Sequence, residues 1–337
     1  PNNGLISQTL LRGPITVSTL GNYTSLNGVA FTPFDDNWNL IGNPYPSAIS
    51  ANQLLFENRE SNGGMMAGFI NIWRHGIDIQ TGINNPFYGS YIYNYDPNDY
   101  LTYNVLGASC CPAVGDYKIG AGQGFFVQMI EGAPATGVVN FTNTMRRDQS
   151  GLVYDNSTFF RNISTESSLP IFERHRIWLD LVAQNNKSQR ILLGYISGAS
   201  NDFDSFYDVP APNKNDLDLY SLIGTQHLKI ESRALPFSNI DEIPLGYFAP
   251  LDGNYNIAIG SIDGLFENEN IYIKDLQLNS YHDLKAAPYQ FQSTSGSHNN
   301  RFVLVFQNPS LGSTEFETNF TIDVYNDNKS IGIKSNL

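Results

Sequence analysis

The fold is decided by the stretch WNLIGNPYP at residues 38–46, which has a counterpart in GAGQGFFV at residues 120–127. Trp38, Leu40 and Ile41 predict a buried strand, and this strand must end abruptly. Gly42 and Asn43 tolerate positive φ, and each of the two following prolines removes a ladder donor. In the second stretch a glycine-rich turn comes first and the apolar run follows it. We therefore predict that the two stretches form strands of one β domain.

The composition favours an all-β protein. The chain has 337 residues, enough for two domains of ordinary size. Aromatic residues make up 13% of the chain and charged residues 15%, with 29 glycines and 17 prolines. β-forming residues between frequent turn residues are typical of sheets, and no long helical periodicity is present. One short helix is predicted within residues 46–56, capped by Ser47 or Ser50.

Short strands recur through the second half of the chain. Residues 176–182 and 190–196 alternate apolar and polar around a turn and predict a hairpin, and further strands are expected at 227–232, 254–259, 271–275, 289–292 and 301–306. This spacing is typical of a β-sandwich. We predict two consecutive antiparallel β-sandwich domains, jelly-roll or Ig-like. Their expected bounds are 1–145 for an aromatic- and glycine-rich domain, 146–167 for a linker, and 168–318 for the second domain.

The net charge and the hydropathy of the chain limit the kinds of partner that it can bind. The formal net charge is −13, from 32 acidic and 19 basic residues, and such a surface repels phosphate backbones. Nucleic acid is therefore an unfavourable partner. No apolar run approaches the roughly 20 residues of a membrane-spanning helix. The chain begins at Pro1 without a start methionine or signal peptide, so we expect it to be an internal portion of a longer protein.

The two cysteines, Cys110 and Cys111, are adjacent. Neighbouring cysteines can close only a strained ring, so a disulfide within the chain is disfavoured. Their spacing also fits no zinc pattern. We expect two thiols, with a bridge to another chain as the alternative.

Aromatic residues gather between residues 68 and 106. Tyr91, Tyr93 and Tyr95 fall on one face of a predicted strand, and Trp73 precedes them. One interpretation is a row of flat rings against which the faces of sugars stack. The interpretation that we favour is cross-strand aromatic pairing, with the tyrosine hydroxyls in water.

Motifs for catalysis are absent from the sequence. It contains no HExxH, CxxC, P-loop or G-x-S-x-G pattern, and no pair of carboxylates is distinguished by its position. The densest acidic group is Asp202, Asp204 and Asp208, and oxygen ligands this close suit Ca²⁺, although a solvated loop is the simpler interpretation. We therefore predict no catalytic residues, and calcium as the one candidate cofactor.

Several segments together resemble a recurrent region of large cell-surface proteins from Bacteroidetes, especially flavobacteria, that are exported by the type IX secretion system. The resemblance rests on their order along nearly the whole chain: residues 38–49, 120–127, 145–146, 159–161, 175–179, 193–199, 233–237, 243–247, 263–265 and 300–304. Residues 321–337 are similar to the opening of the variant sorting signal often called type C. In this family the region precedes a C-terminal sorting domain, so we expect residues 319–337 to be the truncated start of a third β-sandwich, the sorting domain.

The resemblance implies a location and a role. It implies protein transport across the outer membrane, with the type IX translocon and outer-membrane shuttle proteins as partners, and display or release outside the cell. It carries over no catalytic residues. We therefore expect a non-enzymatic, adhesin-like module of a secreted cell-surface protein. The alternative is a carbohydrate-binding module, using Trp73 and the tyrosine row on surface glycans and attached to an upstream secreted hydrolase.

Overall fold

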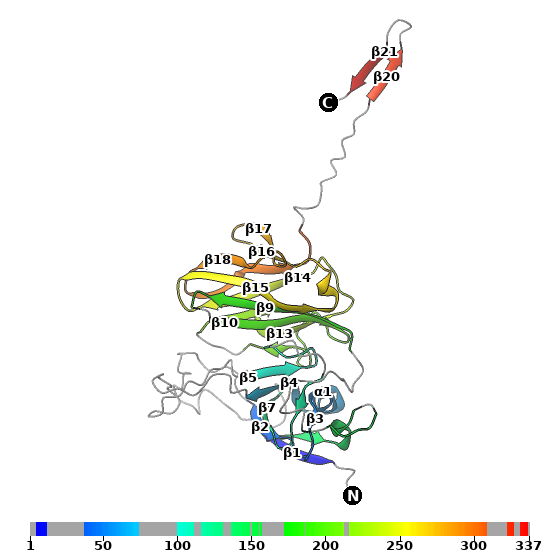
Figure 1. Cartoon of the computed structure of the whole chain (residues 1–337), viewed down its shortest axis with the longest axis vertical. Helices are drawn as coiled ribbons and strands as arrows, with labels where there is room; N and C mark the ends of the chain where they lie inside the picture. The colour runs from blue at the N-terminus through cyan, green and yellow to red at the C-terminus, as the bar shows by residue number, and fades with distance from the viewer. Residues whose placement is uncertain are drawn as a thin grey trace. The chain divides into compact units, whose positions relative to one another are not determined.

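The computed structural model describes residues 5–11, 37–73, 100–110, 116–130, 136–148, 150–154, 156, 172–185, 187–211, 216–308, 322–326 and 331–335. The chain divides into two compact units, Pro1–Gln307 and Asn308–Leu337. We refer to the described part of the first unit up to residue 156 as the N-terminal lobe and to residues 172–306 as the barrel (Figure 1). The predicted boundaries at residues 145 and 168 stay predictions.

The N-terminal lobe is built on a four-stranded antiparallel sheet. In spatial order its strands are β2 (Trp38–Gly42), β7 (Gly124–Met129), β4 (Met66–Trp73) and β5 (Tyr100–Asn104). Two further antiparallel pairs belong to the lobe: β1 (Ile6–Leu11) with β8 (Thr136–Phe141), and β3 (Ile49–Ser50) with β6 (Lys118–Ile119). Strands therefore dominate this half, as the composition predicts.

The two stretches that decide the fold pair directly with each other. Strand β2 runs antiparallel to β7, with Ile41 opposite Phe125 and Gly42 opposite Gly124. The turn before β7 takes positive φ at Gly122, 69°. This confirms the prediction that both stretches are strands of one β region. The expected burial of the first strand is wrong for Trp38 and Leu40, which are 38% and 66% exposed, because only the face of β2 that carries Ile41 is covered by the lobe core.

Asn43 joins the two stretches through its side chain. The residue is 3% exposed, and its Nδ2 donates to the carbonyl oxygens of Ser47, Ile119 and Gly120 at 2.9, 3.0 and 3.0 Å. Its Oδ1 accepts the N–H of Tyr45 at 3.0 Å. A buried carboxamide with these partners satisfies main-chain groups that the abrupt end of β2 leaves without a ladder partner.

The predicted helix is present as α1 (Ala51–Glu57). Ser50 caps it, because its side chain accepts the N–H of Gln53 at 3.0 Å, and Leu54 and Leu55 bury its inner face. Short 3₁₀ turns occur at Glu60–Asn62, Asn143–Arg146 and Gly264–Glu267. Across the described ranges, no helix is long and apolar enough to span a membrane.

The barrel is one eleven-stranded sheet that nearly closes on itself. Ten strands follow the order β17-β16-β19-β14-β12-β13-β10-β9-β15-β18, and β11 pairs with β13 beside this path. Their bounds are β9 Arg174–Ala183, β10 Ser188–Ile196, β11 Val209–Pro210, β12 Asp218–Ile223, β13 Gln226–Ala234, β14 Glu242–Ala249, β15 Gly253–Asp263, β16 Tyr272–Asp275, β17 Ser280–Asp283, β18 Tyr289–Ser293 and β19 Gly296–Val305. The all-β prediction is thus confirmed, and the number of sandwich domains stays a prediction.

Strand β9 contributes to two hydrophobic cores. Ile177, Leu179 and Leu181 point into the barrel, where they join the barrel core. Between them Trp178 points the other way and is completely buried in the core of the N-terminal lobe, together with Ile230 of β13. Successive side chains of a strand face opposite sides, so a strand apolar on both faces must be covered on both.

Side chains of β9 and β10 also bind the main chain of residues 105–110, the segment of the lobe directly after β5. The donors and acceptors are Arg174 Nη1 to Val105 O (3.1 Å), Arg176 Nη1 to Leu106 O (3.1 Å), Trp178 Nε1 to Ala108 O (2.9 Å) and Arg190 Nη1 to Cys110 O (2.8 Å). Asp263 pairs with Arg176, and Asp180 pairs with Arg190. These bonds satisfy carbonyl groups that lie beyond the end of a strand, and they hold this segment on the barrel.

The prediction of free thiols is wrong. Cys110 is disulfide-bonded, and Cys111 is the only other cysteine in the sequence. The prediction weighed only the strain of the small ring that a disulfide between neighbouring cysteines closes. In the folded protein the main chain at Cys110 is anchored to the barrel, since its carbonyl oxygen accepts the Arg190 guanidinium.

A loop between β10 and β12 lies directly on β4. The N–H of Gly68 in β4 donates to Ser205 O at 2.9 Å, and Asn104 Nδ2 donates to Tyr207 O at 2.6 Å. A Cβ at Gly68 would lie 1.9 Å from the carbonyl oxygen of Phe206. Only a residue without a side chain permits this approach of two backbones.

The buried carboxylate of Asp208 holds the 204–208 loop by hydrogen bonds to the main chain. It is 1% exposed, its Oδ1 accepts the N–H of Ser232, and its Oδ2 accepts the N–H of Asp204, both at 2.8 Å. Burial is the largest influence and raises the pKa of Asp208 to about 7, while the two hydrogen bonds act in the opposite direction.

The second unit contains the antiparallel pair β20 (Ile322–Asn326) and β21 (Ile331–Ser335), with Val324 opposite Ile333. It coincides with most of the segment predicted to begin a sorting domain.

The approach at Gly68 yields a stability prediction. We expect Gly68→Ala to lower the free energy of unfolding by about 3 kcal/mol, because the new methyl group must push the 204–208 loop away from β4. Gly124→Ala is the matched control: its Cβ would lie 3.6 Å from the nearest side-chain atom, an ordinary contact. Urea unfolding followed by tryptophan fluorescence measures both variants. Equal stabilities would contradict the tight contact.

Asp208 yields a pH prediction. An unfolded aspartate ionises near pH 3.9, so between about pH 4 and pH 7 the folded protein binds one proton more than the unfolded chain. Its stability therefore falls as pH rises through this window, by at most about 4 kcal/mol, and levels off above it. Asp208→Asn removes this titration.

The comparison between wild type and Asp208→Asn isolates the effect. At pH 4 the variant is the less stable protein, because its amide leaves a buried N–H without an acceptor, at about 1–3 kcal/mol. The gap between the two proteins narrows towards pH 7. Urea unfolding at several pH values measures it, and a gap that stays constant from pH 4 to pH 8 would show that the folded pKa is not raised.

Candidate functional site

Trp73 is the last residue of β4. The aromatic rings described around it belong to Tyr100 and Phe126, and neither was part of the predicted row. Its ring contacts Tyr100 edge-on, with centroids 4.9 Å apart, and Tyr100 contacts Phe126 at 5.8 Å. All three rings are half-buried. Tyr91, Tyr93 and Tyr95 lie outside the described residues, so a row that includes them stays a prediction.

These rings belong to one face of the four-stranded sheet. In β4, Phe69 and Trp73 lie on one face, and Ile70 and Ile72 lie on the other; Phe69 is buried in the lobe core as the two isoleucines are, whereas Trp73 is half-buried. Phe69 also contacts Trp38 of β2, with ring centroids 5.8 Å apart. Leu40 on β2 is 66% exposed. We call this set, Trp38, Leu40, Phe69, Trp73, Tyr100 and Phe126, the aromatic face.

The acidic group at 202–208 is arranged by main-chain contacts. Asp208 is buried with both oxygens occupied, Asp204 Oδ1 accepts the N–H of Phe206 at 2.9 Å, and Asp202 is exposed. Among the residues that the structure describes, no three His, Cys, Asp or Glu side chains are grouped so that they could hold a metal ion. Calcium binding here stays a prediction. The observed role of Asp204 and Asp208 is to shape the loop against β4.

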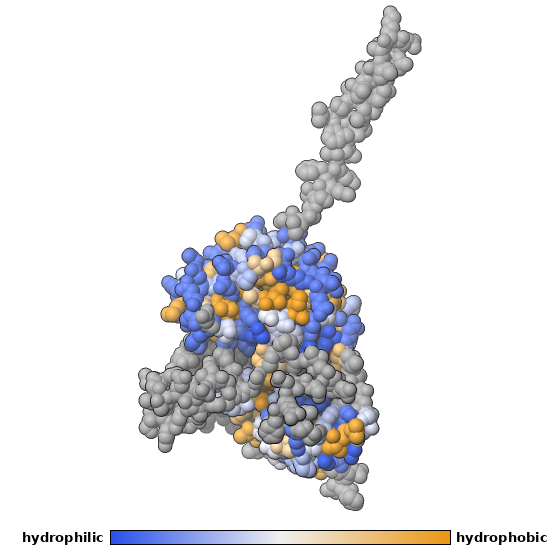
Figure 2. Space-filling model, in the orientation of Figure 1, coloured by the Kyte–Doolittle hydropathy of each residue, from blue (hydrophilic) through white to orange (hydrophobic). Residues whose placement is uncertain are grey.

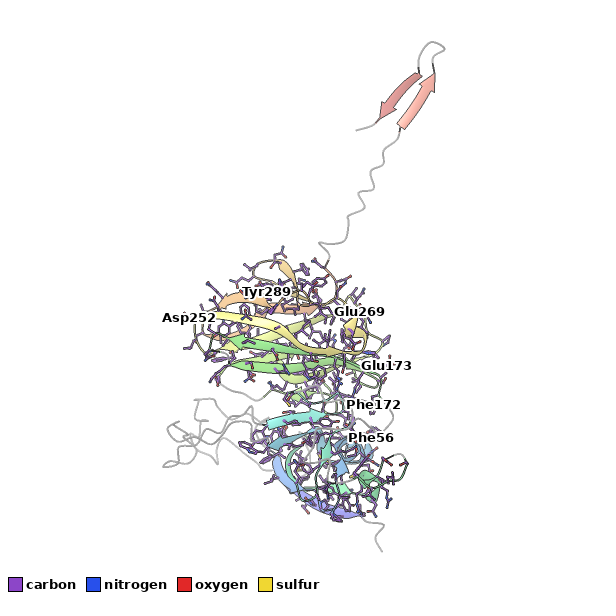
Figure 3. The ribbon with its side chains drawn as sticks, in the orientation of Figure 1. Phe56, Phe172, Glu173, Asp252, Glu269 and Tyr289 are labelled. Carbon is purple, nitrogen blue, oxygen red and sulfur yellow. The ribbon has the colours of Figure 1, made fainter. Side chains whose placement is uncertain are left out.

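A pocket of about 600 Å³ opens at one end of the barrel. Figure 3 labels Asp252 at this end and Tyr289 on β18 nearby. The lining residues come from four separate turns and strand ends: Asp252, Gly253, Gln277, Gln292, Ser293, Thr294, His298 and Arg301. Figure 2 shows that the visible surface of the barrel is mostly hydrophilic, with hydrophobic patches between.

Arg301 makes three hydrogen bonds in the pocket wall. Its Nε and Nη2 donate to Oδ2 of Asp275 at 3.1 and 3.0 Å, and its Nη1 donates to Gln292 O at 2.7 Å. Asp275 is fully buried and also accepts the hydroxyl of Tyr289 at 2.9 Å. Burial would raise the pKa of Asp275, but the hydrogen bonds from Arg301 and Tyr289 outweigh it and the pKa is lowered. The pair is therefore ionised near neutral pH.

His298, also on β19, is held by three neighbours. Its ring stacks on Tyr247 with centroids 4.8 Å apart, and its Nε2 lies 2.9 Å from Thr294 O and 3.2 Å from Ser293 Oγ. Ser293 Oγ in turn lies 3.0 Å from the Tyr247 hydroxyl. The imidazole is thus positioned by three neighbours, and the pocket is largely preformed.

Sequence reasoning did not find this pocket. Gln292 and Arg301 lie in the strands expected at 289–292 and 301–306, and none of the lining residues carries a motif. The one signal in the sequence was that polar turns cluster at corresponding ends of predicted strands, which loops of binding proteins often do.

Comparisons with known proteins give one match. The profile of a family described as "Domain of unknown function (DUF8693)" matches residues 1–306, which include the lobe, the barrel and the pocket. No curated protein matches the chain, and no solved structure matches it either. Since the family match extends over far more than half of the sequence, the chain belongs to the DUF8693 family.

Proposed function

We propose that the chain is a non-enzymatic extracellular module of a large cell-surface or adhesin-like protein, exported across the outer membrane by the type IX secretion system. The ordered resemblance along the sequence is the observation that carries this proposal. In this proposal the two β regions are consecutive sandwich-type domains that the exported protein displays outside the cell.

The roles of the buried acids support a structural module. Asp275 is bound by Arg301 and Tyr289, and Asp208 is bound by two main-chain N–H groups. These are the partners of acids that hold a fold together. General acids and bases instead need a carboxyl that reaches a substrate.

The C-terminal unit supports export by this route. Residues 308–337 form a separate unit that contains the β20–β21 pair, and in this proposal the pair is the opening of a β-sandwich sorting domain. The partners in this proposal are the translocon and the outer-membrane shuttle proteins. The acidic surface is compatible with life outside the cell, and nucleic acid stays an unfavourable partner.

Export can be tested in a type IX-competent flavobacterium. The full-length protein is expressed in a strain with an intact translocon and in a strain whose translocon is disrupted, and surface exposure is measured by labelling of intact cells. We expect labelling in the first strain and periplasmic retention in the second. A β-barrel outer-membrane protein serves as the control for membrane integrity. Equal labelling in both strains, or none in either, would refute the proposal.

The aromatic face favours a second candidate function, carbohydrate binding beside an upstream hydrolase. Trp73, Tyr100 and Phe126 form a continuous set of rings, and exposed Leu40 extends the apolar surface. Aromatic rings on one face of a sheet offer the flat apolar surface on which a sugar ring packs, with polar edges left for water. In this candidate Trp73 is the principal contact.

A glycan array followed by titration tests the second candidate. We expect Trp73→Ala to weaken binding of any retained glycan by about tenfold or more, since a lost ring contact is worth about 1.4 kcal/mol on this scale. Val138→Ala, an exposed apolar position on β8, is the control and should bind as wild type does. Thermal unfolding shows whether Trp73→Ala remains folded. An array without binding, or affinity unchanged in the variant, would remove this function.

A further inference from the structure

The pocket at the end of the barrel lies where the sheet fails to close. Strand β18 is at one end of the strand order, and β16 and β19 are near the other. Pocket residues Gln292 and Ser293 come from β18, and His298 and Arg301 come from β19. The pocket therefore lies at the seam of the barrel.

Side chains bridge this seam. Arg301 Nη1 on β19 donates to Gln292 O on β18 at 2.7 Å, and Tyr289 on β18 donates to Asp275 on β16 at 2.9 Å. A direct bridge from one strand to the other leaves no space for an inserted peptide strand, because a strand needs nearly 5 Å on each side. The volume of about 600 Å³ lies in the range of small-molecule sites, so the geometry suits a compact ligand.

The charges of the pocket disfavour an anion. The positive charge of Arg301 is matched by buried Asp275, and Asp252 adds a carboxylate to the lining. Phosphate or carboxylate ligands need an excess of positive charge, which is absent here. A divalent cation is also poorly served, since Asp252 is the single carboxylate of the lining and its Oδ1 already accepts the N–H of Ser295 at 2.7 Å.

The remaining polar groups match a ligand with many hydroxyls. The side chains of Gln277 and Gln292 are exposed, and each carboxamide offers both a donor and an acceptor. Neighbouring hydroxyls on a sugar ring also donate and accept, so one carboxamide or one carboxylate can bind two of them. The hydrogen bonds of Arg301 to Asp275 and Gln292 orient its guanidinium before a ligand arrives.

Exposed leucines flank the pocket. Leu251 is 67% exposed and precedes Asp252, while Leu276 and Leu278, 46% and 63% exposed, stand on either side of Gln277. They are sequence neighbours of lining residues, and the inference below does not depend on them.

We infer that the seam pocket is a binding site for a neutral saccharide unit, with Gln277, Gln292 and Asp252 binding its hydroxyl groups and Arg301 orienting it. This inference is independent of the aromatic face and of the export route.

The test uses the chain of residues 1–337 and a panel of neutral monosaccharides and disaccharides, including glucose, galactose, mannose, N-acetylglucosamine and their methyl glycosides. Binding is measured by saturation-transfer NMR and by calorimetry. We expect at least one sugar to bind and the double variant Gln277→Ala/Gln292→Ala to lose about tenfold or more in affinity. Gln290→Ala is the matched control, because Gln290 is equally exposed on β18 and outside the pocket lining.

Three outcomes would overturn the inference. They are no binding by any sugar of the panel, affinity unchanged in the double variant, or stronger binding of inorganic phosphate than of any sugar. The Trp73→Ala variant separates the two sites: a sugar lost with Trp73→Ala and retained by the glutamine double variant binds the aromatic face, and that result also counts against the pocket. Thermal unfolding of each variant confirms that it is folded.

Discussion

Burial of β9 on both of its faces is the constraint on which the rest of the structure depends. One set of its side chains fills the barrel, and Trp178 from the other set fills the core of the N-terminal lobe. Neither core is complete without the other, so lobe and barrel form one compact unit. The arginines of β9 and β10 make the contact specific, because they bind the carbonyl groups of residues 105, 106 and 110. Apolar burial supplies the driving force, and these hydrogen bonds set the register.

Much of the fold follows from local patterns in the sequence. The strands at residues 38–42 and 124–129, the capped helix and the hairpin of β9 and β10 are all predicted by alternation and turn residues. Strand β14 is different. It contains Pro244 and Gly246, which sequence rules place at edges or bulges, yet it pairs on both sides, with β12 and β19. The pairing with β19 shifts register at Gly246, where a Cβ would lie 2.2 Å from the ring of Tyr220, so long-range packing selects the glycine.

In the candidate sites, too, local sequence patterns predict the single residues, and long-range packing decides which residues meet. Trp73 is on a strand face, as its sequence position predicts, but its neighbours Tyr100 and Phe126 come from strands whose pairing the sequence does not reveal. The acids at 202–208 suggest a cation when counted along the chain, whereas their hydrogen bonds are to main-chain N–H groups. The seam pocket gathers residues from Asp252 to Arg301, and its chemistry exists only once strand order is known. Residue types were visible in the sequence, and their proximity was not.

Strand β13 pairs with β10 in parallel, whereas the other pairings among the described strands are antiparallel. A parallel neighbour requires the chain to cross over between the two strands, and here the crossing segment carries the 204–208 loop that lies on Gly68. The crossover joins residues far apart along the polypeptide, and contacts of this kind slow the conformational search. During synthesis the N-terminal lobe emerges first, and its core stays incomplete until the residues of β9, β10, β11 and β13 that fill it have been synthesised.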